Sequence, residues 1–124
     1  SFIEPSGLAP ENVSSPFDYA IIAKEALADP LVAKITSTKS YSFSTRDTKV
    51  AHTLTNTNQL LKTSAYHITG SKTGYLDEAG YCLMTRVSAP QGNIITVNFG
   101  SQSKAANFSD NESLIRYGLS LISK

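Results

Sequence analysis

Apolar residues at helical spacing predict two helices, one near each end of the chain. Ser15 and Pro16 form a helix start, because a serine hydroxyl suits the N-cap and proline suits the first helical position. Asp29-Pro30 ends this helix, since proline disfavours helical geometry in the residue before it, and residues 31–35 add one short turn. The predicted apolar stripe of this helix consists of Phe17, Ala20, Ile21 and Leu27.

The second predicted helix begins at Ser109, which has the spacing of a capping box with Glu112. Glycine costs about 1 kcal/mol of helix propensity relative to alanine. We therefore expect Gly118 to allow a close approach to another element. The apolar face of this helix consists of Leu114, Ile115, Gly118, Leu121 and Ile122.

Alternating apolar residues between the two helices predict β-structure. Residues 39–43 and 50–54 alternate on either side of a polar turn, which predicts a β-hairpin. Three further strands are predicted over residues 67–73, 81–89 and 94–99, and their short connections imply antiparallel pairing. The fold class is therefore α+β: an antiparallel sheet of about three strands plus a hairpin, flanked by an N-terminal-side helix and a C-terminal helix.

The composition fits one globular domain over residues 1–124, with 40% hydrophobic and 17% charged residues. A net charge of +1 without a cluster of Lys or Arg argues against a nucleic-acid surface. No apolar run approaches the roughly 18 residues of a membrane span. The single cysteine, Cys82, excludes a disulfide framework and is expected to be a small buried residue.

The candidate chemistry lies where Lys72-Thr73-Gly74 ends a predicted strand and a second strand follows. An ammonium group at Lys72 offers positive charge for a carboxylate or for proton transfer. Thr73 offers a hydroxyl donor, and Gly74 lets a substrate backbone lie against the strand. The alternative is an exposed edge strand with a glycine bulge. The triplet has the form of one of three active-site motifs of the penicillin-binding enzymes.

Two other strings resemble the remaining motifs of those enzymes but stand in the wrong places. The string from Ser101 to Lys104 matches S-x-x-K, which composition alone predicts roughly once in such a chain. It shows no apolar helical stripe, although the nucleophile and its lysine should share one helix face. Ser109-Asp110-Asn111 matches S-D-N, but we expect it to cap the last helix. We therefore assign neither string to catalysis.

The remaining polar candidates have simple structural explanations. His52 alternates with apolar strand residues and is expected to be packed, and His67 is expected at the surface. No Cys, His, Asp or Glu stands at metal spacing with either histidine, so we predict no metal and no cofactor. Asn56-Thr57-Asn58 either braces a turn, which we favour, or holds a loop against a cleft.

Several blocks, in order along nearly the whole chain, resemble the serine D-alanyl-D-alanine carboxypeptidases and endopeptidases, the low-molecular-mass penicillin-binding proteins. The similar blocks are Phe2-Ile3-Glu4-Pro5-Ser6-Gly7-Leu8, Asn12-Val13-Ser14-Ser15, Asn56-Thr57-Asn58-Gln59-Leu60-Leu61, Ser71-Lys72-Thr73-Gly74-Tyr75, Asp77-Glu78-Ala79-Gly80-Tyr81-Cys82-Leu83, Phe99-Gly100-Ser101 and Arg116-Tyr117-Gly118. The resemblance covers only the C-terminal half of the family's catalytic domain, with its penicillin-binding and β-lactamase-like fold.

The resemblance implies cleavage of a D-Ala-terminated bond in peptidoglycan peptides through an acyl-serine intermediate, which penicillin traps. Lys72 would be catalytic, helping to bind the substrate carboxylate and setting the electrostatics of the site. Thr73 would donate to the same carboxylate, and Gly74 would let the substrate run along the strand. The backbone N–H of Tyr75 would be one arm of the oxyanion hole. Residues 56–61 would pack near the triplet strand.

The chain lacks several catalytic parts that the family has. The nucleophilic serine and the second motif precede this region in the family, so this chain alone is expected to be inactive. An arginine that some members place after the last strand is replaced by Gly100-Ser101-Gln102-Ser103.

The resemblance implies peptidoglycan peptide stems as ligands, and β-lactams once the missing half is present. An extracytoplasmic place, in the periplasm or cell envelope of a bacterium, is also implied.

The family fold would leave one edge of the isolated sheet unpaired and part of its core uncovered. We therefore expect the chain to pair with its missing N-terminal half or with a second copy of itself. Two alternative functions stay open. One is a non-catalytic module that binds peptidoglycan peptides or a partner through the same strand. The other is a rearranged active site built from Ser101 and Lys104.

Overall fold

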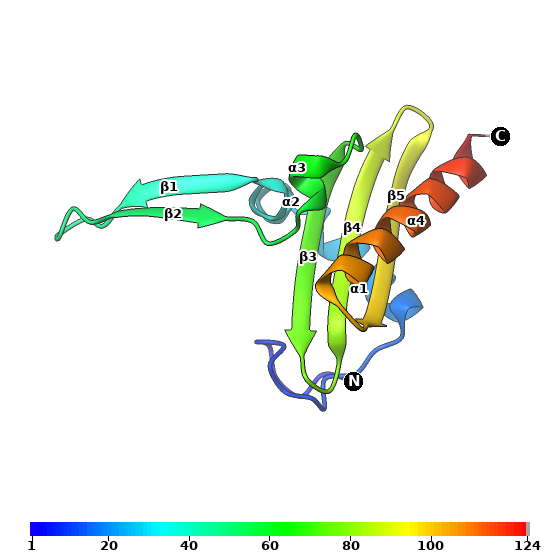
Figure 1. Ribbon diagram of the computed structural model, residues 1–124, viewed down its shortest axis with the longest axis horizontal. Coiled ribbons are helices and arrows are strands. Elements are labelled where there is room, and N and C mark those ends of the chain that lie inside the picture. Colours follow the sequence, from blue (N-terminus) through cyan, green and yellow to red (C-terminus); the bar gives the residue numbers. More distant parts are fainter. Residues whose placement is uncertain (124) are drawn as a thin grey trace.

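A three-stranded antiparallel sheet lies between two helices, and a separate hairpin projects from this body (Figure 1). The computed structural model describes residues 1–123. In chain order the elements are α1 (Pro16–Ala26), α2 (Pro30–Ser37), β1 (Ser40–Ser44), β2 (Ala51–Thr55), α3 (Leu60–Thr63), β3 (Ile68–Leu76), β4 (Gly80–Ala89), β5 (Gly92–Ser101) and α4 (Lys104–Ile122). The α+β class, the hairpin and the antiparallel sheet are confirmed.

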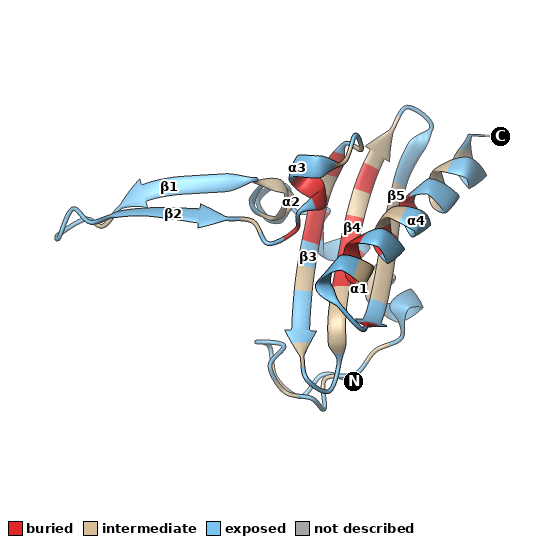
Figure 2. Ribbon diagram, in the orientation of Figure 1, coloured by how far each residue is buried: buried red, intermediate tan, exposed pale blue. Residues whose placement is uncertain are grey.

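The sheet has the strand order β3-β4-β5, so β4 is central and is covered on both faces. Leu83 and Val87 face α4, where they pack with Ile115. Met84 points the other way and packs with Leu27 of the segment that follows α1. Figure 2 shows the buried positions concentrated on β4 and on the parts of β3, α3 and α4 near it. Each core is therefore a thin layer on one face of the sheet.

The start of α1 is as predicted, but its apolar stripe is wrong in part. The Ser15 hydroxyl accepts a hydrogen bond from the Asp18 backbone N–H at 3.1 Å, which caps the helix. Leu27 is 2% exposed, whereas Phe17 is 76% exposed. Apolar residues occur on two sides of α1, and the sheet covers only the side that carries Ala23 and Leu27. The opposite side is an apolar surface.

The last helix begins at Lys104, five residues before the predicted start, because Ser103 caps it by accepting from the Ala106 N–H. Ser109 lies inside the helix and donates its hydroxyl to the Ala106 carbonyl, so the predicted capping box is wrong. The buried positions of the helix include two polar residues, which interrupt its apolar pattern in the sequence. These positions are Asn107, Phe108, Asn111 and Ile115.

The expected close approach at Gly118 is confirmed. A Cβ built on Gly118 would lie 3.0 Å from Cδ1 of Ile94 on β5. A larger residue would push α4 away from the sheet, so the lost helix propensity is offset by closer packing.

The remaining local predictions have mixed outcomes. The hairpin pairs Phe43 with His52, and their rings stack with centroids 5.3 Å apart. Every residue of β1 and β2 is exposed, so His52 packs on a neighbouring ring and not in a core. Cys82, expected to be buried, is half-buried, and His67 is exposed as predicted. Helix α2 has 8 residues, two turns in place of one.

Candidate active site along strand β3

The triplet Lys72-Thr73-Gly74 lies inside β3, which continues to Leu76, three residues beyond the predicted end. Strand β3 pairs with β4 on one side, and no other strand of residues 1–123 pairs with its outer side. The triplet therefore lies on an edge strand, where a ligand backbone can approach.

The register of β3 on β4 sends the two reactive side chains of the triplet to opposite faces of the sheet. Lys72 lies opposite Met84 and Thr73 lies opposite Leu83. Residues that face one another across a strand pair share a face, and successive residues alternate. Lys72 is therefore on the α1 face, and Thr73 is on the α4 face.

Gly74 lies where the chain itself leaves space. A Cβ built there would meet only Cβ of Cys82, at 3.7 Å, which is an ordinary contact. The fold therefore does not require a glycine at this position. The missing side chain leaves the edge of the strand open at this position.

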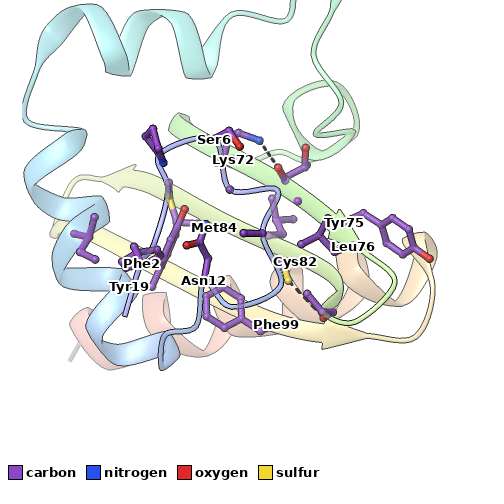
Figure 3. A pocket seen from close by; sticks show the side chains of 18 of the residues that line it. Phe2, Ser6, Asn12, Tyr19, Lys72, Tyr75, Leu76, Cys82, Met84 and Phe99 are labelled. Atoms are coloured by element: carbon purple, nitrogen blue, oxygen red, sulfur yellow. Dashed lines mark hydrogen bonds between the residues drawn. The ribbon is translucent and has the colours of Figure 1, made fainter.

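A cavity of about 530 Å³ lies on the α1 face of the triplet (Figure 3). Its wall is mostly apolar, and Lys72 is the only basic residue among those that line it. The apolar side chains around it include Phe2, Tyr19, Ile22, Met84 and Phe99.

A second cavity, of about 510 Å³, reaches the same strand edge and is lined by residues of β3, of α4 and of the N-terminal segment. Its lining contains two lysines, Lys72 and Lys104, and no acidic residue among the described residues. Thr57, Thr73 and Asn107 add hydroxyl and amide groups. This arrangement suits a ligand group with negative charge.

The N-terminal segment forms a compact loop that lines both cavities through Ser6 and Gly7. Its centre is the Glu4 carboxylate, which accepts hydrogen bonds from the backbone N–H groups of Leu8 at 3.0 Å and Ala9 at 3.1 Å. It also accepts from the hydroxyl and the N–H of Ser6. These bonds, led by the one from the Ser6 hydroxyl, lower the pKa of Glu4 from 4.5 to about 2. The sequence predicted only irregular chain here, because the bonds depend on loop geometry.

Tyr75 is fixed by its side chain. Its hydroxyl donates to the Asp77 carboxylate at 2.7 Å, and its ring lies against Tyr81 with centroids 4.5 Å apart. The hydrogen bond to Asp77, together with the nearby negative charge, raises the pKa of Tyr75. The phenol therefore stays protonated and keeps its hydrogen bond to Asp77.

The segment Asn56-Thr57-Asn58 both braces a turn and contacts the triplet. The Asn56 amide donates to the backbone carbonyls of Thr36 at 3.4 Å and Thr38 at 3.1 Å at the end of α2. Between the two asparagines, Thr57 Oγ1 lies 2.6 Å from Thr73 Oγ1. The favoured structural role is confirmed, and the segment packs near the triplet strand as the family resemblance implies. The specific hydrogen bond between Thr57 and Thr73 was not predicted.

The two strings that resemble the missing motifs lie elsewhere in the fold. Ser101 ends β5 and donates to Asp110 at 2.8 Å, whereas Lys104 opens α4, so the two do not share a helix face. Asn111 is 0% exposed and takes part in a buried network with Thr96 and Asn98.

Comparisons with known proteins agree with this geometry. Residues 1–103 match the D-alanyl-D-alanine carboxypeptidase family. The chain is 41% identical over 104 residues to the D-alanyl-D-alanine carboxypeptidase DacF of Bacillus subtilis, covering 82% of this chain and 26% of that protein. It is 28% identical over 116 residues to a D-alanyl-D-alanine endopeptidase of Pseudomonas aeruginosa, covering 94% of this chain and 37% of that protein.

A solved structure has the same fold. The Streptomyces K15 DD-transpeptidase superposes with a TM-score of 0.78 and 30% sequence identity, covering 86% of this chain and 42% of that one. The chain thus spans well under half the length of each of these relatives. On the family match and the shared fold, the chain belongs to the D-alanyl-D-alanine carboxypeptidase family, the penicillin-binding serine peptidases.

Proposed function

We propose that this chain is the C-terminal half of a serine-type D-Ala-D-Ala peptidase that acts on peptidoglycan peptides. One observation carries the proposal: on the edge strand β3, Lys72, Thr73 and the open position at Gly74 border two cavities. A D-Ala-terminated peptide is an extended chain with a carboxylate at its end. An edge strand with adjacent cationic and hydroxyl groups is complementary to both parts.

In this proposal each residue of the strand has a separate role. Lys72 sets the electrostatics of the reaction and helps to bind the terminal carboxylate. Thr73 donates its hydroxyl to that carboxylate, and Gly74 leaves room for the peptide backbone. The backbone N–H of Tyr75 is one arm of the oxyanion hole.

Lys104 supplies the second positive charge for the carboxylate. It lines the same cavity as Thr73 and follows the segment in which some family members have an arginine. Two lysines without an acidic neighbour in the cavity wall leave positive charge for the ligand. The chain thus keeps a cation on the α4 face without that arginine.

The nucleophilic serine comes from outside this chain. Its oxygen attacks the carbonyl carbon of the penultimate D-Ala, its proton passes to the amine of the departing D-Ala, and water later cleaves the ester. The apolar cavity on the α1 face is a suitable seat for the element that carries the serine, since Lys72 stands at its border. A β-lactam would acylate the same serine, so it requires the complete domain.

The partner of this chain is then the preceding half of the same domain or a second copy. Large apolar side chains exposed on α1 and α2 support this, including Phe17, Ile21, Leu31 and Ile35. The proposed site of action is the periplasm or cell envelope of a bacterium, where peptidoglycan lies. Within residues 1–123, none of the helices has the length and apolar character needed to cross a membrane.

The test is to isolate the native protein with whatever sequence precedes Ser1 and to measure two activities. We expect acylation by a fluorescent penicillin and release of D-Ala from a peptide that ends in D-Ala-D-Ala. Lys72→Ala should abolish both, whereas Lys62→Ala on the exposed side of α3 should leave both unchanged. A native protein that starts at Ser1 and releases no D-Ala would overturn the proposal of a peptidase.

A second candidate function is a non-catalytic module that binds peptidoglycan peptides. It is favoured by one observation: both cavities beside β3 are formed by residues of this chain. Calorimetric titration of residues 1–124 with a D-Ala-D-Ala peptide distinguishes the two functions. Binding by the chain alone would support the module, and the absence of binding would support a half-site.

A further inference from the structure

We infer that Thr57 is a positioning residue that directs the hydroxyl of Thr73 toward the ligand. The inference rests on the proposed function, because it concerns the same carboxylate site. Thr57 lies on the connection between β2 and α3, 16 positions before Thr73 in the sequence. Their Oγ1 atoms are 2.6 Å apart, and both residues line the cavity that contains Lys104.

The direction of this hydrogen bond decides what Thr73 can offer. Each hydroxyl has one hydrogen to donate and two lone pairs to accept with. If Thr73 donated to Thr57, it would have no hydrogen left for a carboxylate in the cavity. When Thr57 donates, the hydrogen of Thr73 is available for the carboxylate. The two successive hydrogen bonds, from Thr57 to Thr73 and from Thr73 to the carboxylate, then strengthen each other by polarisation.

Hydrogen bonds on both sides of Thr57 hold its backbone in place, which keeps its hydroxyl beside that of Thr73. On one side Asn56 donates to two carbonyl groups at the end of α2, and its own Oδ1 accepts from the Asn58 N–H at 2.9 Å. On the other side Asn58 is fully buried, and its Oδ1 accepts from the Leu60 N–H at 3.0 Å. A donor placed in advance saves the entropy of ordering it when the ligand binds.

The choice of a threonine at position 57 is not explained by stability. Its side chain is exposed, and within residues 1–123 its only side-chain hydrogen bond is the one to Thr73. Exposed neutral hydrogen bonds contribute little to folding, because water can replace the lost partner. A role in binding explains why this contact lies at the border of the cavity.

The experiment compares Thr57→Val with Thr57→Ser in the native protein. Valine has the shape of threonine without the hydroxyl, and serine keeps the hydroxyl. We expect Thr57→Val to raise KM for a D-Ala-D-Ala peptide about fivefold, as the loss of one neutral hydrogen bond predicts, with kcat nearly unchanged. Thr57→Ser should restore KM to within about twofold, and Thr53→Val on the exposed hairpin is the matched control.

A double-mutant cycle with Thr73→Val identifies the path of the effect. If Thr57 acts through Thr73, then Thr57→Val should have no further effect on KM in the Thr73→Val background. An unchanged KM in the single variant, or the same fivefold rise in both backgrounds, would overturn the inference. If Thr73→Val itself leaves KM unchanged, the proposed carboxylate site fails and not merely the role of Thr57.

Discussion

Leu27, just after α1, packs its side chain against Gly70 of β3. A Cβ built on Gly70 would lie 2.5 Å from Cδ2 of Leu27, and Leu27 is itself buried. The same strand contains Gly74, where a Cβ would meet nothing closer than 3.7 Å. Two glycines four residues apart thus serve different purposes, one for packing and one for access.

Gly70→Ala should therefore destabilise the fold, whereas Gly74→Ala should leave stability unchanged. Overpacking a buried contact costs about 1–3 kcal/mol, and the Gly70→Ala variant should lose that amount in urea denaturation. In the native protein Gly74→Ala should weaken the binding of a D-Ala-D-Ala peptide instead. Equal stability losses for the two variants would contradict this division of roles.

Asn111→Ala should destabilise the protein by about 1–3 kcal/mol, the cost of leaving buried polar partners unsatisfied. Its amide donates to Asn98 Oδ1 at 2.7 Å and to the Leu83 carbonyl at 3.4 Å, and Thr96 donates to its Oδ1. Thermal unfolding measures the loss, with Ser113→Ala on the exposed side of α4 as the control. If Asn111→Ala unfolds at the same temperature as the control, this network contributes nothing to stability.

Lys104→Gln should raise KM for a D-Ala-D-Ala peptide by up to about fivefold, since exposed ion pairs contribute about 1 kcal/mol or less. The effect should shrink as salt is added, because mobile ions screen an exposed lysine. Kinetics of the native protein at low and high ionic strength measure both effects. Lys34→Gln on α2 removes the same charge away from the cavity and should leave KM unchanged. A salt-independent defect in Lys104→Gln would indicate a steric role.

The loop around Glu4 should open in acid within a defined pH range. Its pKa is lowered to about 2 from 4.5, so its contribution to stability is fully present above pH 4.5. The contribution declines as pH falls from that value and is lost as pH passes through about 2. NMR titration of the Leu8 and Ala9 amides should follow this range. Glu4→Gln should remove the dependence, and a midpoint near pH 4.5 in the native sequence would contradict the lowered pKa.

The apolar surface of α1 should make the isolated chain self-associate. Phe17 and Ile21 are exposed there, and exposed apolar patches of this kind mark interaction surfaces. Sedimentation of residues 1–124 at high concentration should reveal a dimer, which Ile21→Glu should weaken. Thr53→Glu on the hairpin provides the control. A monomer at all concentrations would count against a partner on this face.

The sequence predicted the parts of the fold whose patterns are local. The hairpin and the three strands follow from alternation and short turns, which depend only on neighbouring residues. The start of α4 was mispredicted because Asn107 and Asn111 occupy buried positions and satisfy their polar groups with distant partners. Helix α1 has apolar residues on two sides, and the sequence alone does not tell which side packs against the sheet.

The proposed site divides in the same way between local and distant residues. Lys72, Thr73, Gly74 and Tyr75 are adjacent in the sequence and form a known motif. Thr57 and Lys104 join them only through folding, because each belongs to a different element. The sequence around each of them carries no local signal that it lies beside β3.

Lys72 and Thr73 lie on opposite faces of the sheet, so a shift in the register of β3 on β4 would exchange their positions. Thr69 is an extra residue in β3 between the pairs Ile68–Val87 and Gly70–Arg86, and Arg86 donates to both its hydroxyl and its carbonyl oxygen. A slip of one position would present the ammonium where the hydroxyl now stands. The Arg86 guanidinium, by holding the bulge, therefore helps to fix which face of the sheet the Lys72 and Thr73 side chains occupy.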